Sequence, residues 1–148
     1  MPGFNWGDLP TGNFNNYGGF NWNGFKCENS FSKRDLLAPR HFQDKCVSGV
    51  AHHDKKQAPS FGCDGKTIDK TSISGFQVTP EFDCDLEFHY DMPDGSVCKH
   101  RQACKKSGTQ VNNSQCGGAK NVTIVVPKQP AVPKETCHFG FHSITFDC

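Results

Sequence analysis

The sequence predicts a mainly β protein: a small disulfide-stabilised antiparallel β-sandwich or barrel with long loops and little helix. Three observations predict this class. Apolar and polar residues alternate along several short segments, the chain of 148 residues contains 9 cysteines, and it holds only 17 Leu, Ile and Val residues against 13 Phe. Disulfides compensate for a core that is poor in aliphatic side chains. The length suits one core rather than two.

The N-terminal segment differs in composition from the rest of the chain. Residues 1–25 contain 6 Gly, 6 Asn and 7 of the 17 aromatic residues, and Asp8 is their sole charge. Such a bias marks a segment with its own role. We therefore divide the chain into an aromatic, Gly/Asn-rich segment (residues 1–34), which is a candidate propeptide, and a disulfide-rich β domain (residues 35–148).

Residues 26–67 are polar and are predicted to be mostly loop. A short helical candidate covers residues 35–42, and Pro39 interrupts it. From Lys66 onward the apolar period changes to two, which predicts strands. The first of these strands lies within residues 67–79, with a break near Gly75.

The clearest strand is predicted at residues 82–90, where polar residues alternate with the apolar ones. The apolar positions are Phe82, Cys84, Leu86, Phe88 and Tyr90. Pro93-Asp94-Gly95 then forms a turn, and residues 96–99 begin the return strand of a hairpin.

Two further strands are predicted near the C-terminus. Residues 121–126 are rich in β-branched side chains, and residues 137–148 alternate with Phe at several positions. The parity of the second pattern changes between Gly140 and Ser143. This change predicts a β-bulge or burial on both faces.

The cysteines are predicted to form disulfides. Cys98 and Cys104 enclose a short basic loop and form a compact candidate pair. The paired spacings of a zinc site do not occur, and the nearest approach is Cys137-His138 with His142, so no metal or cofactor is predicted. The disulfide candidates are Cys46, Cys63, Cys84, Cys98, Cys104, Cys116, Cys137 and Cys148.

Nine cysteines cannot all pair within one chain, and Cys27 is the candidate for the one without a partner. It precedes the dibasic pair Lys33-Arg34, a site of the kind that processing proteases cut during secretion. Cleavage there would remove Cys27 and leave eight cysteines. Alternatively the pair stays uncut and Cys27 is free or bridges two chains, so the protein is a monomer or a dimer through Cys27.

Two sequons indicate glycosylation in a secretory pathway. Asn112-Asn113-Ser114 and Asn121-Val122-Thr123 match the acceptor pattern. Asn121 stands at the start of a predicted strand, which favours Asn112 as the occupied site. Together with the cysteines, the sequons predict a secreted, extracellular protein.

Charge and hydropathy exclude two classes of partner. The chain has 16 Lys and Arg against 15 Asp and Glu, so no basic field is available for nucleic acid. No apolar stretch approaches the roughly 18 residues that a membrane-spanning helix needs. We therefore expect neither nucleic-acid binding nor membrane insertion.

The N-terminal aromatics are a candidate glycan platform. In an extended chain, the two Phe-Asn-Trp copies place their rings on one face and their amides on the other. Sugar rings stack on aromatic faces, and sugar hydroxyls bond to amides. The candidate residues are Phe4, Asn5, Trp6, Phe20, Asn21 and Trp22. The alternative is that these rings cover a core that is poor in aliphatic side chains.

An enzymatic alternative depends on residues 14–20. This stretch, Phe14-Asn15-Asn16-Tyr17-Gly18-Gly19-Phe20, resembles the guanine-binding segment of the small guanyl-specific ribonucleases. Gly18 stands where that family has the glutamate that recognises the base. No acid–base set follows the stretch, so no catalytic residues are assigned.

Residues 115–124 and 137–148 resemble the C-terminal part of small cysteine-rich proteins that filamentous fungi secrete, and the resemblance covers residues 82–148. It implies an effector, an elicitor or a wall-associated protein, and it implies no active-site residues. We therefore expect a non-enzymatic secreted protein that recognises a host protein receptor or a cell-wall polysaccharide. The alternatives are a carbohydrate-binding module that uses the N-terminal aromatics and a guanyl-specific ribonuclease-like enzyme.

Overall fold

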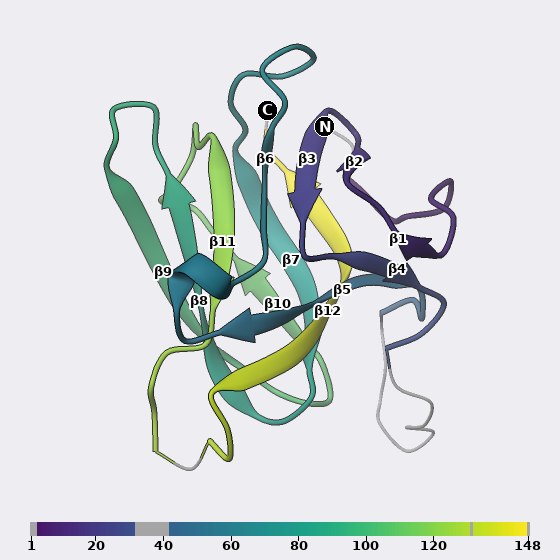
Figure 1. Cartoon of the computed structure of the whole chain (residues 1–148), viewed down its shortest axis with the longest axis vertical. Coiled ribbons are helices and arrows are strands. Elements are labelled where there is room, and N and C mark those ends of the chain that lie inside the picture. The colour runs from purple at the N-terminus through teal and green to yellow at the C-terminus, as the bar shows by residue number, and fades with distance from the viewer. Residues whose placement is uncertain (1–2, 32–41, 131, 148) are drawn as a thin grey trace.

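The fold is mainly β, as the sequence predicts. A computed structural model describes residues 3–31, 42–130 and 132–147 (Figure 1). Within these ranges, helix is limited to the 3-10 turn η1 (Lys55–Gln57). The strands are β1 (Gly12–Asn13), β2 (Asn16–Tyr17), β3 (Phe20–Asn23), β4 (Lys26–Glu28), β5 (Cys46–His52), β6 (Ser60–Cys63), β7 (Ile73–Pro80), β8 (Cys84–Asp91), β9 (Val97–Cys104), β10 (Thr109–Asn112), β11 (Asn121–Val125) and β12 (Thr136–Phe146).

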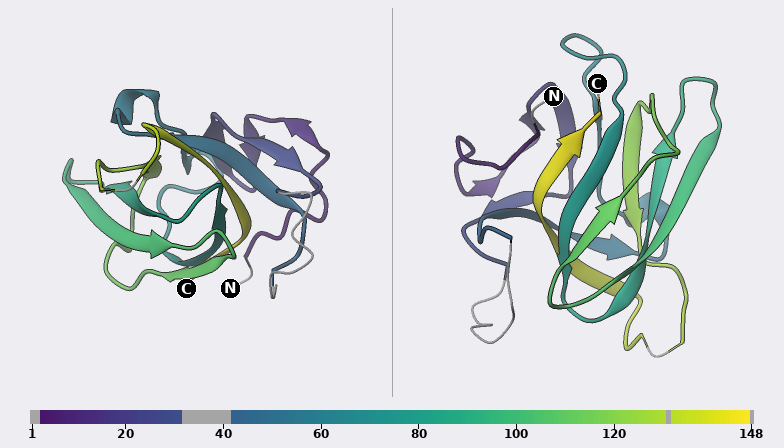
Figure 2. Two further views of the ribbon diagram at one scale, coloured as in Figure 1. Left: turned by 90° about the horizontal axis from the view of Figure 1, so that it is seen from below. Right: turned by 180° about the vertical axis from the view of Figure 1, so that it is seen from behind.

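The strands pair into two layers of a sandwich-like fold. One layer runs β1-β4-β5-β12-β7-β10 and the other runs β2-β3-β6-β11-β8-β9, with antiparallel pairing throughout each. A single parallel pair, Val125 with His52, joins the layers into one continuous sheet. Figure 2 shows from two further sides how this sheet curls around the core.

Aromatic rings fill the space between the layers. Phe76 on β7 stacks on Phe88 of β8 with ring centroids 5.0 Å apart, and on Phe141 of β12 at 4.6 Å. All three side chains are fully buried. Large rings bury about 150–250 Å² each, so a few of them replace many aliphatic side chains. The abundance of Phe therefore compensates for the scarcity of Leu, Ile and Val.

Several predicted elements are confirmed. The predicted strand at residues 82–90 corresponds to β8, and it pairs with β9 along its whole length as a hairpin. The turn closes with the Gly95 N–H donating to the Met92 carbonyl at 3.0 Å. The predicted strand at residues 121–126 corresponds to β11. On β12 the register shifts between Phe141 and Ser143, where the sequence pattern predicts a bulge.

Other elements differ from the prediction. Residues 26–67 contain three strands that the sequence pattern did not predict, β4, β5 and β6. In β5, several buried positions follow one another. The strand therefore lacks the two-residue alternation of apolar and polar side chains that identifies a half-exposed strand. Gly75 does not break its strand: it pairs with Asn112 and with Thr145 inside the sheet.

The N-terminal segment is part of the sandwich. It supplies β1 to β4, and β3 and β4 extend the two layers beside β6 and β5. Phe4 forms a further bridge to β12, with backbone bonds to Ile144 of 2.8 and 3.1 Å. Of the helical candidate at residues 35–42, all but Phe42 lies outside the described residues, as do Lys33 and Arg34.

Candidate functional site

The rings of the expected glycan platform come together, but they face the core. Trp6, Phe20 and Trp22 are 0%, 2% and 3% exposed. The half-buried ring of Phe4 lies among them, with centroids 5.6 Å from Trp6 and 5.7 Å from Phe20. This burial corrects the expectation of an accessible platform of four rings. Phe20 and Trp22 pack on the ring of Phe61, with centroids 5.6 Å and 4.5 Å away, so they form part of a larger aromatic core.

The indole N–H groups are also engaged inside the protein. Trp6 Nε1 donates to the Phe141 carbonyl at 2.9 Å, and Trp22 Nε1 donates to the Tyr17 carbonyl at 3.1 Å. A buried indole without such a partner would lose stability, so these bonds fix both rings in place. The two tryptophans thus act as structural anchors of the N-terminal segment.

The two expected amides lie in different surroundings. The Asn5 side chain accepts a hydrogen bond from the Gly7 N–H at 3.0 Å and stays in its own loop. Asn21 is exposed on the outer face of β3 and lines a hollow of about 360 Å³ that Asn121 also lines. Asn5 does not line this hollow, so the two amides do not share one site.

A larger groove of about 690 Å³ lies beside this hollow, and we call it the amide groove. Phe14 and Trp22 line it, with ring centroids 5.4 Å apart, and Trp22 and Asn23 border the smaller hollow as well. Phe14 is half-buried, so part of its ring faces the groove. The exposed amide side chains in the lining are Asn13, Asn15, Asn23 and Gln57.

This lining combines an apolar ring with several donors and acceptors. Pockets that bind uncharged polar ligands have such walls, because the ring excludes water while the amides fix the orientation of the ligand. Each amide both donates and accepts, as a hydroxyl does. The amide groove is therefore chemically suited to a sugar chain.

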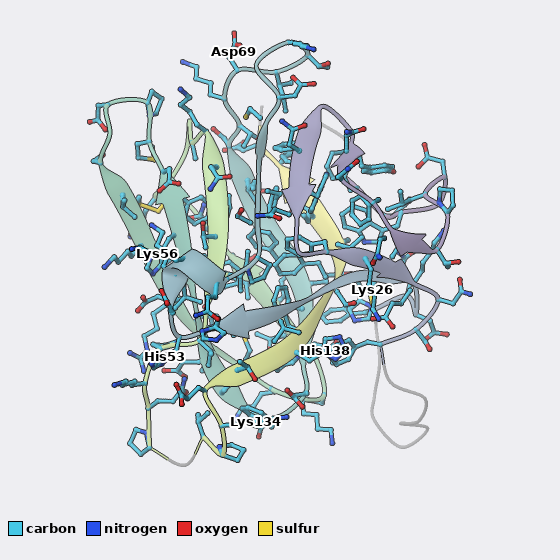
Figure 3. The ribbon with its side chains drawn as sticks, in the orientation of Figure 1. Lys26, His53, Lys56, Asp69, Lys134 and His138 are labelled. Atoms are coloured by element: carbon cyan, nitrogen blue, oxygen red, sulfur yellow. A yellow bond between two sulfur atoms is a disulfide. The ribbon has the colours of Figure 1, made fainter. Side chains whose placement is uncertain are left out.

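The titratable residues of the groove lining lie at its β4 and β12 side. Lys26 and His138 both line it (Figure 3). Burial lowers the pKa of His138, while Glu28, whose Oε2 lies 3.7 Å from His138 Nε2, acts in the opposite direction. His138 is therefore mostly neutral near pH 7. Among the residues that the structure describes, Lys26 is the one cationic side chain in the groove lining, so these walls are predominantly uncharged.

The outer face of β3, β6 and β11 continues this polar surface. Asn21, Gly62 and Asn121 lie in register across the three strands. A Cβ at position 62 would lie 2.6 Å from Asn121 Oδ1, so glycine allows the Asn121 side chain to lie over the strand. Asn121 Nδ2 donates to Asp91 Oδ2 at 3.1 Å.

Sequence reasoning missed most of the groove. Asn13, Phe14 and Asn15 lie in the biased segment, but the pattern that draws attention there is the repeated Phe-Asn-Trp. Gln57 and His138 come from distant parts of the chain. The high Asn content of residues 13–16 is the one local signal that could have indicated this surface.

The structure explains the departure from the ribonuclease-like pattern. Gly18 has φ +64°, a conformation that L side chains rarely adopt, and a Cβ there would overlap the ring of Phe4. The position therefore has no room for the base-recognising glutamate. Among the described residues, no group of three or more His, Cys, Asp or Glu side chains is arranged to hold a metal ion.

We expect Gly18→Ala to lower the free energy of unfolding by about 2–3 kcal/mol. The left-handed backbone conformation and the overlap of the new Cβ with the Phe4 ring both contribute to this loss. Gly65→Ala is the matched control, because Gly65 has φ +77° and open space around it. It should cost about 1 kcal/mol. Urea unfolding followed by fluorescence measures both values. Equal losses would show that the Phe4 ring moves aside freely.

The disulfide pairing differs from the compact pair expected from sequence. Cys98 bonds to Cys116, across a sequence separation of 18. Cys98 and Cys104 lie at opposite ends of β9, and six extended residues span about 20 Å, whereas a disulfide needs Cα atoms about 4–7 Å apart. The described cysteines without a disulfide are Cys27, Cys46, Cys63, Cys84, Cys104 and Cys137. Cys148 lies outside the described residues.

Cys27 has no disulfide partner in the structure, and its side chain is buried. It is 2% exposed, its thiol lies 3.7 Å from the Leu9 carbonyl oxygen, and burial raises its pKa. Register places it opposite Val47, so its side chain and that of Cys46 lie on opposite faces of the β4–β5 pair. A dimer through Cys27 would require β4 to open first.

The two sequon asparagines differ in exposure. Asn112 ends the edge strand β10 and is exposed, whereas Asn121 is half-buried and its amide bonds to Asp91. Glycosylation at Asn112 would leave the polar face of β3, β6 and β11 open. A glycan on Asn121 would cover that face, so we expect Asn112 to be the modified site.

Fold and groove together define a class: a compact, disulfide-containing β domain with an exposed, mainly uncharged polar groove. No helix among the described residues is both long and apolar enough to cross a membrane. No family model matches the sequence.

Two curated fungal proteins are similar to almost the whole chain. It is 42% identical over 154 residues to the adhesion cell surface protein MAD1 of Metarhizium anisopliae, and 35% identical over 146 residues to the adhesin-like cell surface protein MAD1 of Arthrobotrys oligospora. Each alignment covers 99% of this chain but only 21% and 19% of the relatives. The chain thus spans about a fifth of the length of the curated relatives it matches.

Among solved structures, a glycoside hydrolase family 43 arabinoxylan arabinofuranohydrolase from Bacillus subtilis, in complex with cellotetraose, is similar at 14% identity. The match covers 86% of this chain and 25% of that chain, with a TM-score of 0.45.

Proposed function

We propose that this chain is a non-enzymatic recognition domain outside the fungal cell, which attaches the cell to a surface by binding polysaccharide in the amide groove. The observation that carries the proposal is the groove lining, an accessible Phe14 ring surrounded by Asn13, Asn15, Asn23 and Gln57. The relatives support the location and the adhesive role, because both are named as adhesion or adhesin-like cell-surface proteins.

An uncharged polymer fits the groove better than a charged one. Among the described residues, its lining contains four amides and the three rings of Phe14, Trp22 and Phe25, against one lysine and one histidine whose pKa is lowered by burial. Phosphate or nucleic-acid sites concentrate Lys and Arg instead. Chitin, β-glucan and cellulose are therefore the ligands to test.

The test is co-sedimentation with insoluble chitin, β-glucan and cellulose. We expect at least one polymer to retain the protein, and Phe14→Ala to weaken that binding about tenfold, since loss of one ring contact of about 1.4 kcal/mol changes an equilibrium tenfold. Phe82→Ala is the matched control, because Phe82 also packs partly buried against the core but is not part of the groove. Trp22→Ala is unsuitable, because Trp22 is buried in the core.

Two results would contradict this proposal. One is that no polymer retains the wild-type protein, and the other is that Phe14→Ala binds as well as wild type. If no polymer binds but infiltration of the protein into leaves triggers cell death or defence signalling, recognition of a host protein receptor, as in an effector or elicitor, replaces polysaccharide binding. A reduced and alkylated sample controls for the need for a folded protein.

A further inference from the structure

Three cysteines meet at one end of the sandwich. Cys84 begins β8, Cys104 ends β9 and Cys137 lies near the start of β12. They are 7%, 1% and 0% exposed, so the cluster is sealed from solvent. The Cys84 thiol donates to the Cys137 sulfur, with the two Sγ atoms 3.5 Å apart.

Cys84 and Cys137 belong to opposite layers. Strand β8 lies in the layer that contains β11 and β6, whereas β12 lies in the layer that contains β5 and β7. The two residues are 53 positions apart in sequence. A bond between them would therefore link the two layers covalently. It would also close a long loop, and a cross-link that closes a long loop restricts the unfolded chain most.

Cys104 is placed differently. Register sets it directly opposite Cys84 on the neighbouring strand, where backbone hydrogen bonds already join β8 to β9. Its thiol lies 3.6 Å from the Gln102 carbonyl oxygen of its own strand. Burial raises the pKa of Cys104 to about 12, and the pKa of Cys84 is raised as well, so the short Sγ–Sγ contact of Cys84 with Cys137 is what distinguishes the two thiols.

We propose that Cys84 and Cys137 form a second disulfide in the mature protein. Cys104 then remains as a buried reduced thiol, in addition to Cys27. Oxidation removes two electrons and two protons from the pair, and a disulfide of a thiol oxidoreductase or of glutathione accepts them. During folding, before the layers enclose the cluster, the Cys137 thiolate attacks that disulfide and releases one thiolate. Cys84 then attacks the Cys137 sulfur of the mixed disulfide and releases the other.

The direct test is peptide mapping of protein secreted from a eukaryotic host and alkylated under denaturing conditions without reduction. We expect two linked peptide pairs, Cys84 with Cys137 and Cys98 with Cys116, and an alkylated Cys104. Without denaturant, Cys104 should remain unalkylated because it is buried. A Cys84–Cys104 or Cys104–Cys137 link, or alkylation of Cys84 and Cys137, would overturn the proposal.

Thermal unfolding of alanine variants provides an independent measurement. Cys84→Ala and Cys137→Ala should each lower Tm by about 10 °C, and the double variant should lower it no further than the larger single loss. Cys104→Ala is the matched control: it removes a similarly buried sulfur but no bond, and should lower Tm by about 3 °C. The same drop for Cys104→Ala as for Cys84→Ala, or additive losses in the double variant, would contradict the cross-link.

Discussion

Replacement of Trp6 by alanine is expected to lower the free energy of unfolding by about 4 kcal/mol, the range for a fully buried large aromatic side chain. Trp6 is 0% exposed and contacts the rings of Phe4, Tyr17 and Trp22. The substitution leaves a cavity among these rings and removes the hydrogen bond to the Phe141 carbonyl. Urea or guanidinium unfolding, monitored by far-UV circular dichroism, measures the loss.

The Trp6→Phe variant separates the two contributions. It retains most of the ring contacts but lacks the indole N–H that bonds to Phe141. We expect it to lose about 1–2 kcal/mol, the cost of a smaller ring and one unpaired buried carbonyl. If Trp6→Ala lost less than 1 kcal/mol, the N-terminal segment would not be an integral part of the core.

The removal of residues 1–34 is expected to abolish cooperative unfolding altogether. This truncation deletes β1 to β4, and so uncovers the edges of β5 and β6. It also deletes Trp6, Phe20, Trp22 and Phe25 from the buried cluster. Several losses of a few kcal/mol each exceed the roughly 5–15 kcal/mol by which domains are stable. Thermal scans and the dispersion of amide proton signals measure the result.

This truncation also tests whether the segment is a disposable propeptide. The double variant Lys33→Gln, Arg34→Gln removes the dibasic pair and retains the segment, and we expect its Tm to equal that of wild type. A naturally secreted protein that begins at Asp35 and unfolds cooperatively would contradict the prediction. Intact mass before and after reduction determines where the secreted chain begins.

Local patterns predicted the strands whose two faces have different environments. In β8, buried and half-exposed positions alternate from Cys84 to Phe88. The parity change near Gly140 predicted the bulge on β12, since one extra residue exchanges the two faces. Strand β5 escaped prediction because its residues 46–49 are buried one after another, which removes alternation from that part of its sequence.

The groove could not be predicted in the same way. Phe14 and Asn23 are 9 residues apart. Gln57 joins them because β3 pairs with β6, which follows η1, and His138 joins them because β4, β5 and β12 pair in one layer. The Phe-Asn-Trp repeat predicted which side chains share a face. It did not predict that this face would be turned inward.

The sequence by itself determined the fold class, the β8–β9 hairpin and the presence of a disulfide, because alternation, turn residues and cysteine number are properties of short segments or of composition. Only the tertiary structure decided that Trp6 and Trp22 are core residues, that Cys98 bonds to Cys116, and that Phe14 lines a groove. The physical reason is that these outcomes depend on which distant strands pair and in which register. Shifting a strand by one residue turns every side chain to the opposite face.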